Sequence, residues 1–237
     1  MIVRPLMLDT HVTIHDVARQ LPEIPLLRDH CRSMAMLEAI LSPEWADRQY
    51  SFDTRWSTEE DMASMRNGSG DEFSIVFSAA GAYIRGFAHE SHMSPYANDG
   101  PWPGLLDDVP DVFRSCVEEA AFTDEDGMPV VTACTWRGVG DGAWKTGTIE
   151  FPDDGVSDPD GSKYLFRLLA DRSPEAFQRF AEDYYEVPVS LAAIQHVFAL
   201  HPLTSEVVAA LNPEVAMDAL AKDIAEIGYP LGNDTNT

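Results

Sequence analysis

Cysteine and basic residues are both scarce in this chain of 237 residues. Its three cysteines, Cys31, Cys116 and Cys134, lie far apart and form no C-x-x-C pair, which argues against a disulfide framework or a cysteine-based zinc site. Each stands among apolar neighbours in the sequence, where cysteine usually behaves as a small hydrophobic residue. We therefore predict three free thiols that react slowly until the protein is unfolded.

Long apolar runs are also missing. No stretch approaches the roughly 18 consecutive apolar residues of a membrane-spanning helix, and residues 1–16 lack the unbroken apolar centre of a signal peptide. We expect no membrane segment, and a reducing cytoplasm as the compartment.

Positive charge is outnumbered by negative charge. The chain has 16 Lys and Arg against 40 Asp and Glu, a net charge of -24. Such a surface repels nucleic acids and anionic membranes, so a charged partner is expected to be a cation or a basic protein. Solubility alone is the other explanation of the charge. Because 45% of the residues are apolar, the chain has enough material for a substantial core and is not expected to be disordered.

Familiar cofactor and nucleophile motifs are absent from the sequence. It has no Walker A motif, no G-x-G-x-x-G turn that opens a helix and no G-x-S-x-G elbow. The acidic segments 124–127 and 153–160 depart from the order of ligands in an EF-hand. We therefore expect no cofactor.

Apolar periodicity and capping residues predict most of the secondary structure. The expected helices are 22–41, 57–68, 105–121, 173–186, 190–200, 204–211 and 212–228, and the expected strands are 49–56, 72–78, 82–88, 130–136 and 144–151. The strands form two hairpins, 72–88 and 129–151, which we expect in one sheet.

The order of these elements predicts the fold class. Strands gather in residues 50–151 and helices in 162–228, with one more helix in front. That separation is typical of an α+β protein with a mostly antiparallel sheet packed by helices and a helical C-terminal region. We expect a single domain over residues 1–230 and a flexible tail at 231–237.

The segment YIRGFAHESHMSPY, residues 83–96, is the main functional candidate because it runs from a strand into a polar loop. Its candidate binding residues are Arg85, His89, Glu90, Ser91, His92 and Tyr96. On an extended backbone Glu90 and His92 point to the same side, where they could share a metal ion with a third ligand from elsewhere. The spacing differs from the helical H-E-x-x-H motif. The alternatives are a loop whose polar side chains satisfy nearby backbone groups, and a loop that binds a partner or ligand.

Three stretches carry a resemblance to a known family: SMRNGSGDEFSIVFSAAGAYIRGFAHESHMSPY, EDYYEV and IAEIGYPLG. They resemble an uncharacterised actinobacterial protein family whose most distinctive part is an RGFxHESxMSP-like core. The resemblance covers about residues 20–230 and implies a bacterial cytoplasmic protein, without an activity or site residues. A looser likeness, at the level of class, is to the acidic immunity proteins of bacterial toxin systems, and it transfers no residues.

These observations favour a soluble acidic protein that acts by binding a basic protein partner, of the immunity or accessory type. Complementary charge would speed such an association and favour that partner over others. The alternative is a metal-assisted hydrolase that uses the 89–92 loop, where a metal would polarise a substrate or activate water. A third possibility is a DNA mimic, which requires carboxylates spaced like phosphates. The oligomeric state is not predicted.

Overall fold

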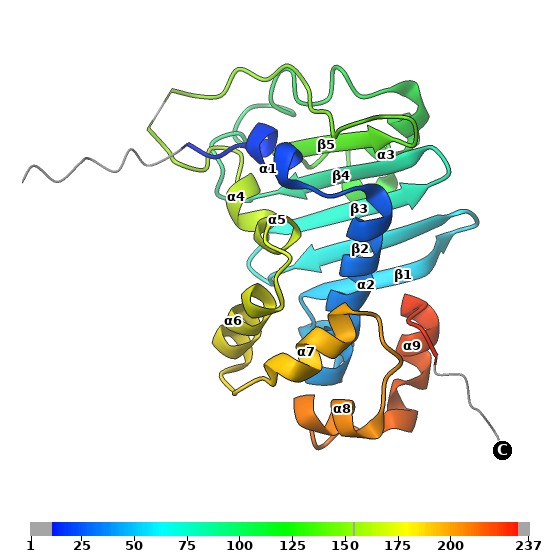
Figure 1. Ribbon diagram of the computed structural model, residues 1–237. Coiled ribbons are helices and arrows are strands. Elements are labelled where there is room, and N and C mark those ends of the chain that lie inside the picture. Colours follow the sequence, from blue (N-terminus) through cyan, green and yellow to red (C-terminus); the bar gives the residue numbers. More distant parts are fainter. Residues whose placement is uncertain (1–10, 154, 232–237) are drawn as a thin grey trace, which may run out of the picture.

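A five-stranded antiparallel sheet forms the centre of the molecule (Figure 1). The computed structural model describes residues 11–153 and 155–231. The strands follow one another across the sheet in chain order: β1 (Tyr50–Ser57), β2 (Glu60–Arg66), β3 (Glu72–Ser78), β4 (Gly81–Phe87) and β5 (Ala133–Gly138). The predicted α+β class is confirmed, and the strands predicted at 49–56, 72–78 and 82–88 are confirmed as β1, β3 and β4.

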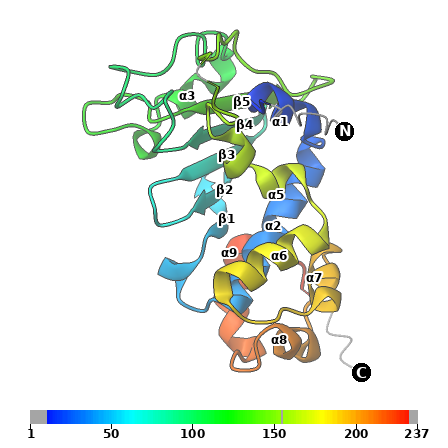
Figure 2. The same ribbon diagram turned by 90° about the vertical axis from the view of Figure 1, so that its left-hand side faces the viewer.

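Helices cover one face of this sheet and extend beyond its β1 edge (Figures 1 and 2). They are α1 (Ile14–Gln20), α2 (Ile24–Leu41), α4 (Ser162–Leu165), α5 (Arg167–Ala170), α6 (Pro174–Tyr185), α7 (Leu191–Phe198), α8 (Ser205–Leu211) and α9 (Ala221–Ile227). The predicted helix 22–41 is confirmed as α2, which packs against β1 and against α7 and α9. Because α2 lies between the sheet and the C-terminal helices, it is buried on nearly every side. The described cysteines are all buried and free, as predicted.

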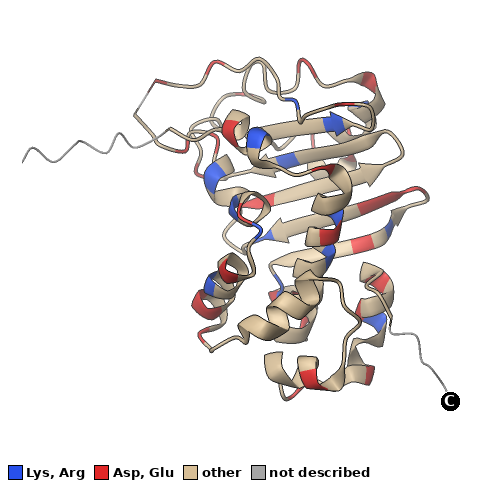
Figure 3. Cartoon of the chain, in the orientation of Figure 1, with Lys and Arg blue, Asp and Glu red and all other residues tan. Residues whose placement is uncertain are grey.

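The other face of the sheet is covered only in part. Turns and short helices from residues 88–131 lie over β3, β4 and β5, and we call them the loop layer. Tyr83 stacks on Phe113 of this layer with ring centroids 6.3 Å apart. Figure 2 shows most of the same face of β1 and β2 free of the loop layer, which meets β1 at Trp56. Acidic residues recur along the loops drawn above β5 in Figure 3.

The helix predicted at 57–68 is wrong, because this segment forms β2. Ser57 and Glu60, which have the spacing of a capping box, face each other across the turn between β1 and β2. Ser57 Oγ donates a hydrogen bond to Glu60 Oε2 over 2.9 Å. Pairing with strands on both sides outweighs the helix propensity of the segment.

The helix predicted at 105–121 is also wrong. The chain forms short helical turns there: η2 (Asp111–Phe113) leads directly into α3 (Arg114–Val117), and η3 (Ala120–Phe122) follows. Pro110 stands at the N-cap of the first turn, where it cannot donate the backbone hydrogen bond that a continuous helix needs. The apolar spacing predicted burial only in part: Val109, Phe113 and Val117 are buried, whereas Leu106 is half-buried and Ala120 is exposed.

The second predicted hairpin, 129–151, forms only in part. Its first strand is β5, which joins β4 in the predicted common sheet. The segment 144–151 is not a strand, and only an isolated bridge links Trp136 to Lys145. Side chains anchor this segment elsewhere: Trp144 Nε1 donates to the Pro22 carbonyl over 2.6 Å, and Thr148 Oγ1 donates to Asp108 over 2.9 Å.

The C-terminal helices largely follow their capping signals. Ser173 and Ser190 cap α6 and α7 through their side chains, as predicted. The helix expected from Asn212 begins later, as the turn η4 (Met217–Leu220) followed by α9, and ends at Gly228 in the left-handed conformation. Asn212 instead donates to the Ile40 carbonyl of α2 over 3.0 Å. The predicted flexible tail lies outside the described residues, apart from residue 231.

Candidate functional site

The segment that follows β4 is a series of tight turns rather than an extended strand. Backbone N–H groups of Ser91, Ser94 and Ala97 each donate to the carbonyl three residues earlier, over 3.0 Å in each case. The alternation used to place Glu90 and His92 on one side of a strand therefore does not apply here.

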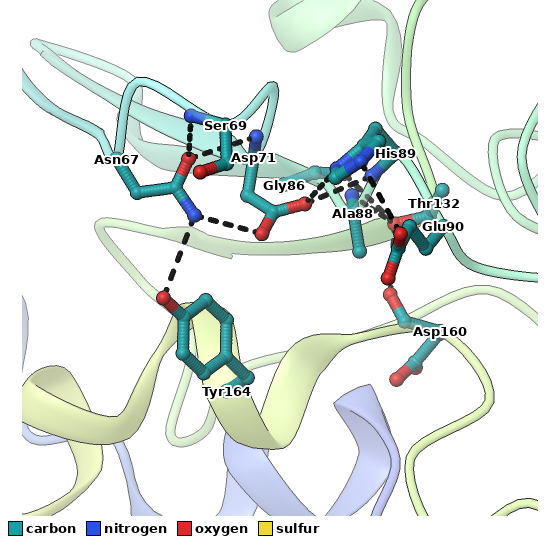
Figure 4. A network of polar contacts seen from close by, with 10 residues as sticks. All are labelled: Asn67, Ser69, Asp71, Gly86, Ala88, His89, Glu90, Thr132, Asp160 and Tyr164. Carbon is teal, nitrogen blue, oxygen red and sulfur yellow. Dashed lines mark hydrogen bonds and ion pairs between the residues drawn. The ribbon is translucent and has the colours of Figure 1, made fainter.

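His89 is fixed by Asp71, as Figure 4 shows. Asp71 Oδ1 accepts the backbone N–H of His89 over 2.9 Å and lies 2.9 Å from its ring Nδ1. Asn67 donates to the other carboxylate oxygen over 2.8 Å. Burial opposes ionisation of Asp71, but these hydrogen bonds outweigh it and lower the pKa of Asp71. The pair therefore holds the turn after β4 against the turn before β3.

Arg85 lies apart from the other candidates, on the face of the sheet beneath the loop layer. It pairs with Glu72, donates to the Val130 carbonyl over 2.6 Å and stacks 4.7 Å from the centroid of Phe122. Its neighbour Gly86 faces the helices on the opposite side. Arg85 therefore joins the loop layer to the sheet and contributes nothing to the 89–96 segment.

The remaining candidate residues differ in the number of contacts that their side chains make and in their exposure. Ser91 Oγ donates to the Pro159 carbonyl over 2.6 Å and accepts the Met93 N–H over 3.0 Å, which is a structural role. The Glu90 side chain is 89% exposed, with a carboxylate oxygen 3.8 Å from His89 Nε2. Tyr96 is 62% exposed and rests edge-on against Phe87.

Glu90 and His92 both line a hollow of about 360 Å³ between the turn after β4 and residues 156–164. Asp71, Asp158 and Tyr164 border the same hollow. Burial raises the pKa of Asp158, although its carboxylate accepts two backbone N–H groups. Among the described residues, no group of three or more His, Cys, Asp or Glu is placed to hold a metal ion. The third ligand that the metal hypothesis needs is thus missing from this part of the chain.

A second concave site lies on the open face of β1 and β2, and sequence reasoning missed it. This cavity of about 440 Å³ is lined by Trp45, Ala46, Arg48, Gln49, Ser51, Phe52, Asp53, Trp56, Met62, Ser64, Arg66, Gly68 and Glu226, and we call it the tryptophan groove. Trp45 is 60% exposed at its edge. Trp56 stacks nearly parallel on Phe122 of the loop layer, with centroids 6.3 Å apart.

Strand alternation builds the floor of the groove. Tyr50 points toward the helices and meets Phe180 of α6, while the next residue, Ser51, points the other way. Ser51 and Ser64 are paired across β1 and β2, and their hydroxyl oxygens lie 2.7 Å apart. The alternation of serine with aromatic residues could have predicted a strand with one polar and one apolar face. It could not have predicted that the polar face stays uncovered.

Two arginines and two carboxylates line the groove, and the excess of negative charge lies around it. Arg48 is neutralised by Asp223 at 2.5 Å, and Arg66 lies 3.8 Å from Glu72. Asp53 and Glu226 line the groove without an ion pair to any described residue. The neighbouring stretch 86–136, which includes the loop layer, carries ten Asp and Glu against one basic residue, Arg114 (Figure 3). A cationic ligand is therefore favoured over an anionic one.

Comparison of the chain with models of protein families, with curated proteins and with solved structures finds no match. Within residues 11–153 and 155–231, no helix combines the length and the apolar composition needed to cross a bilayer.

Proposed function

We propose that the protein acts by binding a basic segment of a protein partner, with the tryptophan groove as the docking surface. The observation that carries this proposal is the exposed Trp45 beside an uncovered sheet face. Tryptophan is enriched among the few residues that supply most of the energy of an interface, and it acts best beside a pocket that excludes water.

Charge supports a basic partner. Asp53 and Glu226 in the groove and the acidic loop layer beside Trp56 surround the apolar surface with carboxylates. A partner that carries Lys or Arg next to an aromatic or aliphatic residue complements both features. Binding without chemistry is how an immunity or accessory protein works, and we extend the proposal to that class. The metal-assisted hydrolase gains no support from the described residues.

The first test is the binding of designed peptides, measured by fluorescence anisotropy. Three labelled 15-residue peptides share the same leucine and phenylalanine positions and carry Lys, Ser or Glu at all the others. We expect the Lys peptide to bind at least about tenfold more tightly than the Ser peptide, a difference of about 1.4 kcal/mol. The Glu peptide is expected not to bind.

Matched variants show whether the groove is responsible. Trp45→Ala is expected to weaken binding of the Lys peptide by about tenfold or more, as truncation of an interface tryptophan does. Tyr96→Ala removes an aromatic side chain of similar exposure outside the groove and is expected to leave binding unchanged. Equal binding of the Lys and Ser peptides, or an equal effect of the two variants, would refute the proposal.

A further inference from the structure

A third concave site, a cleft between α5 and α6, opens on the helical side of the molecule. Its volume is about 600 Å³, within the range of small-molecule sites. It is lined by Gln49, Tyr164, Arg167, Leu168, Asp171, Ala176, Arg179, Phe180, Asp183 and Tyr184, and we call it the arginine cleft. It shares only Gln49 with the tryptophan groove.

Arg167 is the distinctive residue of this cleft. In a chain with a large excess of carboxylates, it forms no ion pair with any described residue, and its one hydrogen bond is from Nη1 to the Tyr164 carbonyl over 3.2 Å. Its guanidinium lies 4.4 Å from the ring centroid of Tyr164 and 5.7 Å from that of Phe180. The two rings hold the guanidinium in place while its other donors remain open to a ligand.

The other charges of the cleft are arranged differently. Arg179 lies 3.6 Å from Asp171, so these two side chains largely neutralise each other. Asp183 also lines the cleft and is exposed. A ligand with several negative charges would meet Asp171 and Asp183 as well as Arg167, whereas a single carboxylate can face the guanidinium alone.

We propose that the arginine cleft binds a planar aromatic monocarboxylate, whose carboxylate pairs with Arg167 and whose ring packs against Tyr164, Phe180 and Tyr184. A guanidinium presents paired N–H donors that match a carboxylate, and this geometry is lost with an ammonium group. The rings of Phe180 and Tyr184 already stack on each other, with centroids 5.8 Å apart. Arg167 contacts the rings of both Phe180 and Tyr164, so all three aromatic side chains lie near its guanidinium.

The proposal is tested with 2-naphthoate as the probe, in titrations of the full chain followed by two-dimensional amide NMR. Its uncharged analogue 2-naphthamide and inorganic phosphate are titrated in parallel. Naphthoate is expected to shift amide signals within residues 164–184 and to bind at least about tenfold more tightly than naphthamide. Phosphate is expected to cause no saturable shift there.

Variants identify the role of Arg167. Arg167→Gln is expected to weaken naphthoate binding by about tenfold, and Arg167→Lys by less, because it keeps the charge but not the paired donors. Arg19→Gln, at an exposed ion pair on α1, is the control. Tyr184→Leu supplies a second test if Arg167→Gln fails to fold. Equal affinity for naphthoate and naphthamide, unchanged affinity in both cleft variants, or shifts confined to other regions would overturn the proposal.

This site stands independently of the tryptophan groove. Trp45→Ala is expected to leave naphthoate binding unchanged, and Arg167→Gln to leave peptide binding unchanged. Failure of either proposal is therefore recognisable without reference to the other.

Discussion

Glu38 is an acidic residue in the core of the protein. Its side chain is fully buried on α2, where Oε2 accepts the Gln49 N–H over 2.7 Å and the Tyr50 N–H over 3.4 Å at the start of β1. Oε1 and the Tyr185 hydroxyl are buried without a hydrogen-bond partner that meets normal geometry. Burial raises the pKa of Glu38 to about 7, against the pull of those hydrogen bonds.

This shift predicts a specific dependence of stability on pH. Because the folded protein binds the Glu38 proton more tightly than the unfolded chain, Glu38 costs no stability near pH 4, destabilises increasingly as the pH rises through its folded pKa, and then has a constant cost. Glu38→Gln keeps an acceptor for the two N–H groups and removes the charge. It is expected to raise the free energy of unfolding at pH 8 by about 2–3 kcal/mol and to have little effect at pH 4.5.

Urea unfolding of the wild type and Glu38→Gln at both pH values checks this expectation. Other titrating groups cancel in the difference between the two proteins. Glu90→Gln, at a side chain that is 89% exposed, serves as the control and should show no such dependence. An equal effect of Glu38→Gln at both pH values would show that Glu38 is not held protonated by burial.

Among the elements, those with a local signal were predictable from the sequence and those decided by distant contacts were not. The hairpin of β3 and β4 follows from Phe73, Ile75 and Phe77, which alternate with Ser74, Val76 and Ser78, and from the turn that follows. β2 was missed because its capping-box spacing and its helix-forming residues contradict its pairing with two other strands. The hollow beside Glu90 and His92 lies at the polar loop that the sequence singled out after a strand. The tryptophan groove could not be predicted, because it depends on which part of the sheet the loop layer leaves uncovered.

The contact between β4 and the helical layer offers a test of this packing. A Cβ on Gly86 would lie 2.7 Å from Cζ of Phe166 and 2.9 Å from Cδ1 of Leu165, so α4 and α5 approach β4 only because this residue is glycine. Gly86→Ala is expected to lower the free energy of unfolding by about 1–3 kcal/mol through overpacking. Gly140→Ala, where nothing lies within 4 Å of the added Cβ, should change it by less than about 0.5 kcal/mol.

Chemical denaturation of both variants supplies the measurement, and a double variant assigns the cause. Phe166→Leu makes room beside Gly86, so the combined variant should be more stable than the sum of the two single effects. If the two changes in the free energy of unfolding simply add, a clash with Phe166 is not the cause of the Gly86→Ala effect.

At the scale of the whole molecule, charge has two opposite consequences. A net charge of -24 makes the folded chain repel itself, and the loop layer concentrates this charge beside the tryptophan groove. The same carboxylates that oppose folding are those that would attract a basic partner. Added salt screens both interactions, so its effects on stability and on binding must have opposite signs.

We therefore expect sodium chloride, raised from about 50 to 500 mM, to increase the unfolding temperature while it weakens binding of the Lys peptide. Differential scanning calorimetry and anisotropy titrations in the same buffers measure the two effects. Glu118→Gln, Glu125→Gln and Asp126→Asn, combined in one variant, remove three carboxylates from the loop layer and should reduce both salt responses. The variant could lose the effect of salt on its unfolding temperature and still keep the full salt dependence of peptide binding. The carboxylates of the loop layer would then repel one another without contributing to the attraction of a partner. That result would separate the acidity of this face from its proposed role in recognition.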